Sequence, residues 1–349
     1  MKGLAEYAEM KRFIVLVALM AATYMGDAQS VPDYLLPTLP PTAEGLGYRG
    51  AVKSVSEFQY EITVADSGEI EGILVPGGNH FAASFNKKGF MITQVVYHND
   101  SQFDTYSYTW NNFDQLTRIT LMQDDTVRET VSIRRNTAQL PVAITYMDET
   151  GAILRKIEQK FGSRNELLHQ TEYNQNIIAA SASFEYNDQL QITAMRQKNQ
   201  DGELVVEYRY SYAPSGQPLQ MSVYDSFGLL ANRTEFIYDS LHRPVEEVVY
   251  NPYGKPIQSM NKKYDGTGDK VIEYTVRGAQ PDRLIHREIS TYNPEGYCTS
   301  TKTTSLHQPQ REAWNFKYRY DERGNWLEKT HFKQGVPFYR TVRTLTYFD

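Results

Sequence analysis

The fold is decided by the stretch from Tyr212 to Gly268, which reads YAPSGQPLQMSVYDSFGLLANRTEFIYDSLHRPVEEVVYNPYGKPIQSMNKKYDGTG. A tyrosine returns in it at positions 212, 224, 238, 250 and 264, in steps of 12, 14, 12 and 14 residues. Most of these tyrosines precede Asp or Asn, and all but one have a glycine four residues later. Such self-similarity predicts an architecture built from repeats, and it carries no signature of a reaction.

Each of these tyrosines leads into a segment with the composition of a tight turn. Asp or Asn at the first position of a type I turn accepts a backbone hydrogen bond, and Pro and Gly are favoured at the second and fourth positions. Residues 251–254, Asn-Pro-Tyr-Gly, meet all of these preferences. His242 stands where glycine is expected, but histidine is one of the few other residues that adopt positive φ. We therefore predict hairpin turns with an adjoining glycine bulge, and expect the turn to survive at His242.

The segments between the turns have the pattern of β-strands. They are about eight to ten residues long, which is a usual strand length. Leu219, Met221 and Val223 place apolar side chains on one face, while Gln220 and Ser222 place polar side chains on the other. This alternation with a period of two residues is typical of strands and not of helices.

The same signal extends, with weaker landmarks, over residues 49–349. Tyr264, Tyr292 and Tyr320 follow one another at 28 residues, which is two units. A unit of one strand and one turn cannot bury an apolar face alone. Strands joined in sequence by short turns form an antiparallel meander, and a long sheet twists and curls. We expect an all-β fold in which a single array forms an elongated, curved antiparallel meander of β-hairpin repeats that partly wraps on itself.

Residues 1–28 have the features of a secretory signal peptide. Lys11 and Arg12 precede an apolar run, and Ala28 supplies the small residue before the cleavage site. Met10 is the more natural start of such a segment; an N-terminal anchor is the alternative, although the run is short for a membrane span. The proline-rich residues 29–48 predict an extended leader. We expect an exported protein of the periplasm or the cell surface, which meets the membrane only through the signal segment before cleavage.

The motif Tyr-Asp-x-x-Gly at this spacing resembles the YD repeat of the RHS/YD-repeat superfamily. Residues 224–228, 264–268 and 320–324 carry the resemblance. The opening segment 50–55 and the closing block 324–330 resemble those of uncharacterised exported RHS-like proteins of Gram-negative bacteria. In the larger family such repeats build a β shell that encloses a toxin, or they form a surface scaffold. We carry over the repeat fold that the resemblance implies, and not the delivery role.

Composition and spacing argue against several other classes of protein. A net charge of −6 argues against nucleic-acid binding, which needs a basic surface. Cys298 is the single cysteine, and we expect a small buried hydrophobe there rather than an intermolecular or reactive thiol. The seven histidines lack metal-binding spacing, and the turn Asp and Asn residues lack the packed oxygens of a calcium loop. We therefore predict no metal, no cofactor and no catalytic residue.

Two alternatives stay open. Adjacent carboxylates such as Glu246 and Glu247 face opposite sides of a strand, so such a pair cannot act as acid and base by itself. A cross-strand pair could, and the chain would then be an envelope- or glycan-directed hydrolase with carboxylates in the concavity of the sheet. A transmembrane barrel would need a continuous apolar outer face, which Lys262, Lys263 and Glu273 interrupt.

Aromatic side chains give the best indication of a binding function. Tryptophan and tyrosine combine apolar area with a polar tip, so they could present a flat face to a glycan or a protein. The alternative is that they form cross-strand ladders that stabilise the sheet. We expect an exported, non-enzymatic scaffold or binding module for a protein or glycan partner. The candidate contact residues are Trp110, Tyr210, Trp314, Tyr318, Tyr320 and Trp326.

Overall fold

The computed structural model describes residues 41–64, 70–76, 78, 80–98, 102–279, 283–306 and 312–349. The expected signal peptide, residues 1–28, and most of the expected leader, residues 29–48, lie outside the described residues. Within the described ranges, no helix is long and apolar enough to cross a membrane.

The described residues form 23 β-strands. The first twelve are β1 (Val52–Val64), β2 (Ile70–Leu74), β3 (His80–Phe85), β4 (Met91–Tyr97), β5 (Phe103–Trp110), β6 (Leu116–Gln123), β7 (Thr126–Arg135), β8 (Pro141–Asp148), β9 (Ile153–Phe161), β10 (Leu167–Asn174), β11 (Ile177–Tyr186) and β12 (Ile192–Asn199). The others are β13 (Leu204–Tyr212), β14 (Pro218–Tyr224), β15 (Leu230–Tyr238), β16 (Pro244–Tyr250), β17 (Pro256–Tyr264), β18 (Val271–Gly278), β19 (Leu284–Tyr292), β20 (Cys298–Ser305), β21 (Glu312–Tyr320), β22 (Trp326–Lys333) and β23 (Val336–Tyr347).

These strands belong to two compact units. Among the described residues, unit 1 contains 159–171 and 179–256, and unit 2 contains 41–158, 172–178 and 257–349. The core of unit 1 consists of Leu167, Ala182, Phe184, Met195, Tyr208, Met221 and Phe236. A core in unit 2 consists of Ala43, Tyr48, Val52, Val55, Ala83, Phe85 and Met91.

Consecutive strands pair antiparallel in both units. In unit 1 the strands from β11 to β16 pair one after another. In unit 2 the strands from β3 to β9 do so, and so do the strands from β17 to β23. The predicted all-β antiparallel meander is confirmed.

The turns follow the chemistry that the sequence predicts. The backbone N–H of Gly228 donates to the carbonyl of Asp225 at 3.0 Å, and Gly228 has a φ of 76°. The register shifts by one residue just before Tyr224, as expected for a bulge beside the turn. His242 adopts a φ of 63°, so the turn does survive without glycine.

The turn after Tyr264 departs from the prediction. It is one residue longer than its neighbours, because Asp265 N–H donates to the carbonyl of Lys270 at 3.0 Å. The left-handed position is therefore taken by Gly266, with a φ of 49°, and not by Gly268. The sequence motif has the right residues there, but the turn uses a different glycine.

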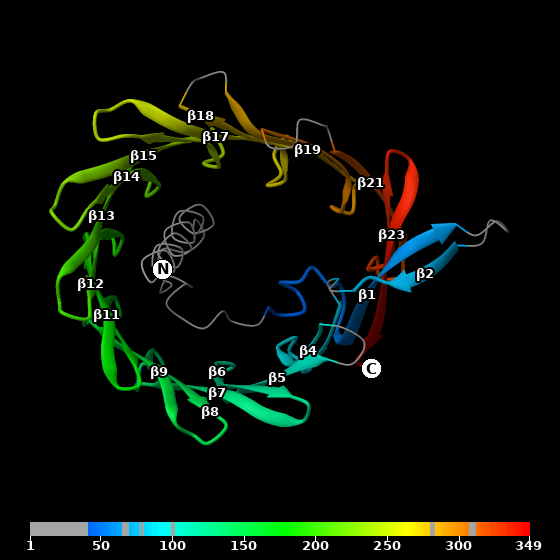
Figure 1. The fold of residues 1–349 in the computed structure, drawn as a ribbon, viewed down its shortest axis with the longest axis horizontal. Coiled ribbons are helices and arrows are strands. Elements are labelled where there is room, and N and C mark those ends of the chain that lie inside the picture. Colours follow the sequence, from blue (N-terminus) through cyan, green and yellow to red (C-terminus); the bar gives the residue numbers. More distant parts are fainter. Residues whose placement is uncertain are drawn as a thin grey trace, which may run out of the picture. The chain divides into compact units, whose positions relative to one another are not determined.

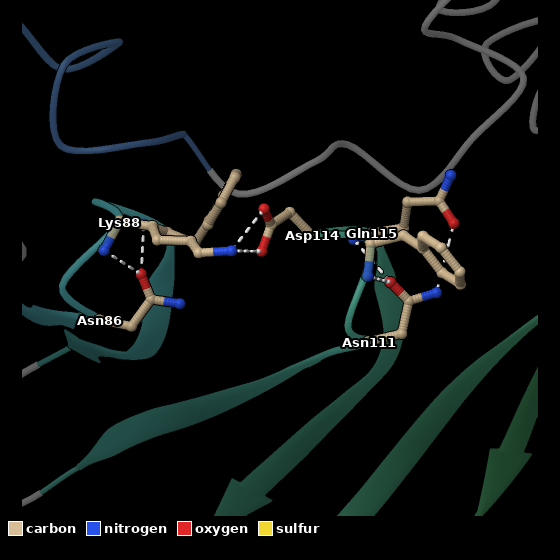
Figure 2. A network of polar contacts seen from close by, with 7 residues as sticks. Asn86, Lys88, Asn111, Asp114 and Gln115 are labelled. Atoms are coloured by element: carbon tan, nitrogen blue, oxygen red, sulfur yellow. Dashed lines mark hydrogen bonds and ion pairs between the residues drawn. The ribbon is translucent and has the colours of Figure 1, made fainter.

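The side chains of the turn Asn and Asp residues hold the turns together. Asn86 Oδ1 accepts hydrogen bonds from the N–H of Lys88, at 3.0 Å, and of Phe90. Asn111 Oδ1 accepts a hydrogen bond from the N–H of Gln115 at 3.0 Å. Figure 2 shows how Lys88 Nζ then links the β3–β4 turn to the β5–β6 turn of unit 2, by an ion pair with Asp114 at 2.8 Å. These residues act as turn caps, which explains their recurrence without a metal.

The tyrosines of the repeat have two distinct roles. The hydroxyls of Tyr212 and Tyr238 each donate to a carbonyl at the start of the preceding strand, at 2.8 Å. Tyr224 and Tyr250 instead lie under guanidinium groups, those of Arg209 at 4.5 Å and Arg233 at 4.7 Å from the ring centroids. The alternation of 12 and 14 residues therefore separates two sets of tyrosines with different environments.

The first and last strands of the array are hydrogen-bonded to each other. β1 pairs antiparallel with β23 from Val52↔Tyr347 to Glu61↔Tyr339, and Figure 1 shows the two strands side by side. β1 also pairs with β3 over Ser54–Glu57. We expected an array that only partly wraps on itself; this pairing corrects that expectation, because it satisfies backbone groups that a terminal strand would otherwise leave unpaired.

Candidate partner-binding surface

Strand β21 places four aromatic rings on one face. Trp314, Phe316, Tyr318 and Tyr320 occupy alternate positions, and alternate side chains of a strand point to the same side. All four are half-buried, while Asn315, Lys317 and Arg319 between them are exposed. Three of the four rings belong to the candidates from the sequence, and Phe316 is added by the structure.

The neighbouring strand β22 places a row of side chains beside these rings. The register pairs Trp314 with Lys333, Phe316 with His331, Tyr318 with Lys329 and Tyr320 with Trp326. We call the six side chains with an exposed portion the aromatic–lysine surface, which is defined by Trp314, Phe316, Tyr318, Tyr320, Lys329 and Lys333.

The lysines of this surface lie over the aromatic rings. Lys329 Nζ is 4.3 Å from the centroid of the Phe316 ring and 5.9 Å from that of Tyr318. Lys333 Nζ is 5.2 Å from the centroid of the Trp314 ring. These distances are within the range of cation–π attraction. The lysine stems thus shield ring area, while their charged ends remain beside the rings.

Burial changes the protonation of this surface. Burial lowers the pKa of Lys329, and the nearby Arg343 guanidinium acts in the same direction. Burial, together with the charge of Lys329, lowers the pKa of His331 to about 4. His331 is therefore neutral at pH 7, where its ring packs edge-on against Phe316 at 5.2 Å. Lys333 differs, because its Nζ pairs with Glu312 at 3.5 Å.

The two tyrosines of the surface are fixed by hydrogen bonds. Tyr318 donates its hydroxyl proton to the carbonyl of Cys298 at 2.7 Å. The hydroxyl of Tyr320 accepts a hydrogen bond from Asn293 Nδ2 at 2.7 Å. Tyr297 packs against both rings, at 5.5 Å and 5.7 Å between centroids. The rings are thus held rigidly, which lowers the entropy that a partner must remove on binding.

Trp326 is too buried to offer much contact area to a partner. It is only 9% exposed, and the Arg343 guanidinium lies 3.4 Å from its ring centroid. Arg343 in turn pairs with Glu57 of β1 at 3.1 Å. Trp326 therefore packs where β22, β23 and β1 meet, and we leave it out of the surface.

Trp110 and Tyr210 are not part of this cluster. Trp110 ends β5, where its Nε1 donates to the carbonyl of Met91 at 2.8 Å and its ring packs on Phe90 at 4.7 Å. Tyr210 belongs to unit 1 and packs against the core of that unit. Both contribute to the cross-strand packing that was the alternative explanation for the aromatic residues.

The carboxylates with shifted pKa values are all held as anions in the part of the chain that the structure describes. Glu207 is one example: a hydrogen bond from Arg209 lowers its pKa, and Arg196 lies 3.0 Å away. Glu246 and Glu247 occupy adjacent positions opposite Ile237 and Phe236, so they face opposite sides of β16. A general acid would need a raised pKa instead.

A metal site is likewise absent from the described ranges. No group of three or more His, Cys, Asp and Glu side chains is placed to hold a metal ion there. A shallow cavity of about 280 Å³ in unit 2 carries no carboxylate. It is lined by Ser54, Val55, Ser56, Ala82, Ala83, Ser84, Thr93, Val95 and Thr344.

Comparison with known proteins gives only distant similarities. No protein-family model and no curated protein matches the sequence. The crystal structure of TcdB2-TccC3-TEV has a TM-score of 0.41 at 13% identity, and the match covers 79% of this chain and 16% of that one. This chain thus spans about a sixth of that protein's length. The Photorhabdus luminescens Tc holotoxin pore gives 0.39 at 14% identity, covering 80% and 16%. A porin-like protein from Bacteroides uniformis gives 0.25 at 12% identity, covering 88% and 98%. These scores do not decide the family or the function.

Proposed function

We propose that the chain is an exported, non-enzymatic repeat protein that acts as a scaffold or binding module in the periplasm or at the cell surface. Its partner is a glycan or a protein of the cell envelope, which it contacts through the aromatic–lysine surface. The relation to RHS-type repeat proteins that the sequence motif implies is part of the same proposal.

One observation carries this proposal: four half-exposed rings and two lysines form one continuous face on two paired strands. Tryptophan and tyrosine are the side chains that contribute most to binding when a partner excludes water from them. The hydrogen bonds of Tyr318 and Tyr320 hold two of the rings in place before a partner arrives. Preorganised rings beside lysines suit a partner that offers both an apolar face and polar groups.

The hydrolase alternative has no comparable support. It requires two carboxyl groups in a cavity, one of them with a raised pKa. Hydrogen bonds from arginine or lysine instead lower the pKa values of described carboxylates such as Glu207 and Glu273. These groups stabilise the sheet surface as ion pairs, so we propose binding and not hydrolysis.

A binding screen tests this proposal. The protein without residues 1–28 is applied to a glycan array and used in a pull-down from envelope extract, beside the variant Trp314→Ala. We expect a ligand that the parent protein retains and the Trp314 variant loses. The matched control is Tyr253→Ala, which removes an aromatic side chain that is 93% exposed on a turn of unit 1. Ligands retained equally by all three proteins would contradict the proposal.

A further inference from the structure

Lys329 occupies the middle of the aromatic–lysine surface without a carboxylate partner. Its Nζ lies over the rings of Phe316 and Tyr318, at 4.3 Å and 5.9 Å from their centroids. Within the described ranges, Nζ forms neither a hydrogen bond nor an ion pair. The residue is half-buried, and its Nζ keeps some exposure to solvent. The amine is thus desolvated on its ring side and still reachable.

Several charged or titratable groups surround this amine. Arg343 on β23 disfavours its protonation, whereas Cys298 on β20 and Glu57 on β1 favour it. Glu57 is already paired with Arg343 at 3.1 Å. His331, two residues further along β22, is neutral at pH 7 because burial lowers its pKa to about 4. The combined result, led by burial, is a lowered pKa for Lys329.

Lys333 provides a comparison four residues away on the same strand face. It also lies over an aromatic ring, that of Trp314 at 5.2 Å. Its Nζ, however, is paired with Glu312 at 3.5 Å. The two lysines therefore differ in their charge partner more than in their aromatic surroundings.

We propose that Lys329 is a nucleophilic amine site that binds carbonyl compounds, and aldehydes in particular, by forming an imine. A lysine that is desolvated in an apolar setting, or that lies beside another cation, is the arrangement in which proteins use lysine as a nucleophile. The rings of Phe316 and Tyr318 border the position that a carbonyl carbon would take. The open-chain reducing end of a sugar belongs to this class of ligand.

The step is a reversible condensation. The deprotonated Nζ attacks the carbonyl carbon, and a C–N bond forms. Both amine hydrogens leave with the carbonyl oxygen as water, and a C=N bond remains. The step oxidises and reduces nothing. Sodium cyanoborohydride, added as an external hydride donor, converts this imine into a stable secondary amine and so records which lysine reacted.

The test is reductive labelling of the folded protein with acetaldehyde and cyanoborohydride at pH 7. Peptide mass spectrometry then measures the rate of ethylation at Lys329 and at Lys333. We expect Lys329 to react at least about threefold faster, because burial lowers the pKa of its amine and so raises its deprotonated fraction. As the pH is raised, the rate at Lys329 should also level off at a lower pH than the rate of an ordinary lysine, because burial lowers the pKa of Lys329. Equal or slower labelling of Lys329 would overturn the proposal.

Two variants separate the causes. Phe316→Gln hydrates the Lys329 amine, so its labelling rate should fall towards that of Lys333. Glu312→Gln removes the ion-pair partner of Lys333 and should leave the labelling of Lys329 unchanged. Urea denaturation of each variant checks that it is folded. If Phe316→Gln leaves the Lys329 rate unchanged in a folded protein, the aromatic surroundings do not activate the amine and the proposal fails.

This inference goes beyond the proposed function and can fail separately from it. The labelling experiment concerns one amine and a small aldehyde, and it needs no partner. Loss of partner binding in the Trp314 variant concerns the whole surface. If Lys329 is labelled rapidly but Trp314→Ala retains the same ligands as the parent protein, this inference is supported and the proposed function is contradicted. If Lys329 is labelled no faster than Lys333 but Trp314→Ala loses a ligand, the proposed function is supported and this inference is contradicted.

Discussion

The side-chain amide of Asn325 holds the backbone of Arg49 at both its N–H and its C=O. Asn325 Oδ1 accepts a hydrogen bond from Arg49 N at 2.7 Å, and Asn325 Nδ2 donates to Arg49 O at 2.9 Å. Nδ2 also donates to the Tyr347 hydroxyl at 2.8 Å, and Asn325 is 0% exposed. One side chain thus joins the segment before β1, the turn before β22 and the end of β23.

Replacing Asn325 with alanine should destabilise unit 2. The change removes three hydrogen bonds from a buried position, so we expect the free energy of unfolding to fall by about 2 to 3 kcal/mol. Urea denaturation measures it as a lower midpoint with an unchanged slope. The control is Asn251→Ala, which removes only the local cap from a turn of unit 1 and should cost about 1 kcal/mol. Equal losses in the two variants would contradict the role given to Asn325.

Replacing His242 with glycine should stabilise the protein. His242 is exposed and adopts a φ of 63°, a conformation that costs a residue with a Cβ about 1 kcal/mol relative to glycine. We expect a gain of about that size in the free energy of unfolding. The reverse change, Gly228→Ala, meets no neighbouring atom within 4 Å, so it should cost a similar amount through backbone strain alone. Thermal melting of both variants checks the two opposite signs.

Removing the hydroxyl of Tyr212 should cost more than removing that of Tyr224. Tyr212→Phe breaks a hydrogen bond of 2.8 Å to the Ile192 carbonyl, which should lower the free energy of unfolding by about 1 kcal/mol. Tyr224→Phe keeps its ring under Arg209 and should change stability less. Burial raises the pKa of Tyr212 to about 12, so its hydroxyl stays protonated throughout the neutral range. Equal losses would show that the two sets of tyrosines do not have different roles.

Acid should destabilise the protein through His331. Its pKa in the folded state is about 4, below the ordinary value of 6.5, so between these pH values the unfolded chain binds more protons. Stability therefore falls as the pH drops from 6.5 to about 4, by at most about 3 kcal/mol for this group. The variant His331→Phe keeps an aromatic ring and should lose this part of the pH dependence. Carboxylates such as Glu207, whose pKa is lowered, contribute a further loss at lower pH in both proteins.

The turns and strands could be predicted from sequence because their causes are local. The Asn of residues 251–254 and the Asp before Gly228 cap their own turns within four residues. His242 was predictable because its tolerance of positive φ is intrinsic. The choice of Gly266 over Gly268 was not, since both glycines fit and the length of the turn decides between them.

The pairing of β1 with β23 and the candidate surface depend on contacts between distant residues. Nothing near Asn325 in the sequence indicates that it bonds Arg49, which lies 276 positions away. Three rings of the β21 row, Trp314, Tyr318 and Tyr320, were candidates from the sequence, but Phe316 and the lysines over the row were not. Lys329 meets Phe316 and Tyr318 only because the register of β21 with β22, including a shift next to Tyr320, places it there. That register also turns Trp326 towards the buried Arg343.

The most direct test of the proposed binding function is the dissociation constant of the ligand identified by the screen, measured for three proteins. These are the parent protein, Trp314→Ala and Tyr253→Ala, each without residues 1–28. Removing a tryptophan ring from a binding surface should weaken binding at least about tenfold, which corresponds to about 1.4 kcal/mol. We predict this loss for Trp314→Ala and an unchanged dissociation constant for Tyr253→Ala. An unchanged constant for Trp314→Ala would show that the partner does not bind the aromatic–lysine surface.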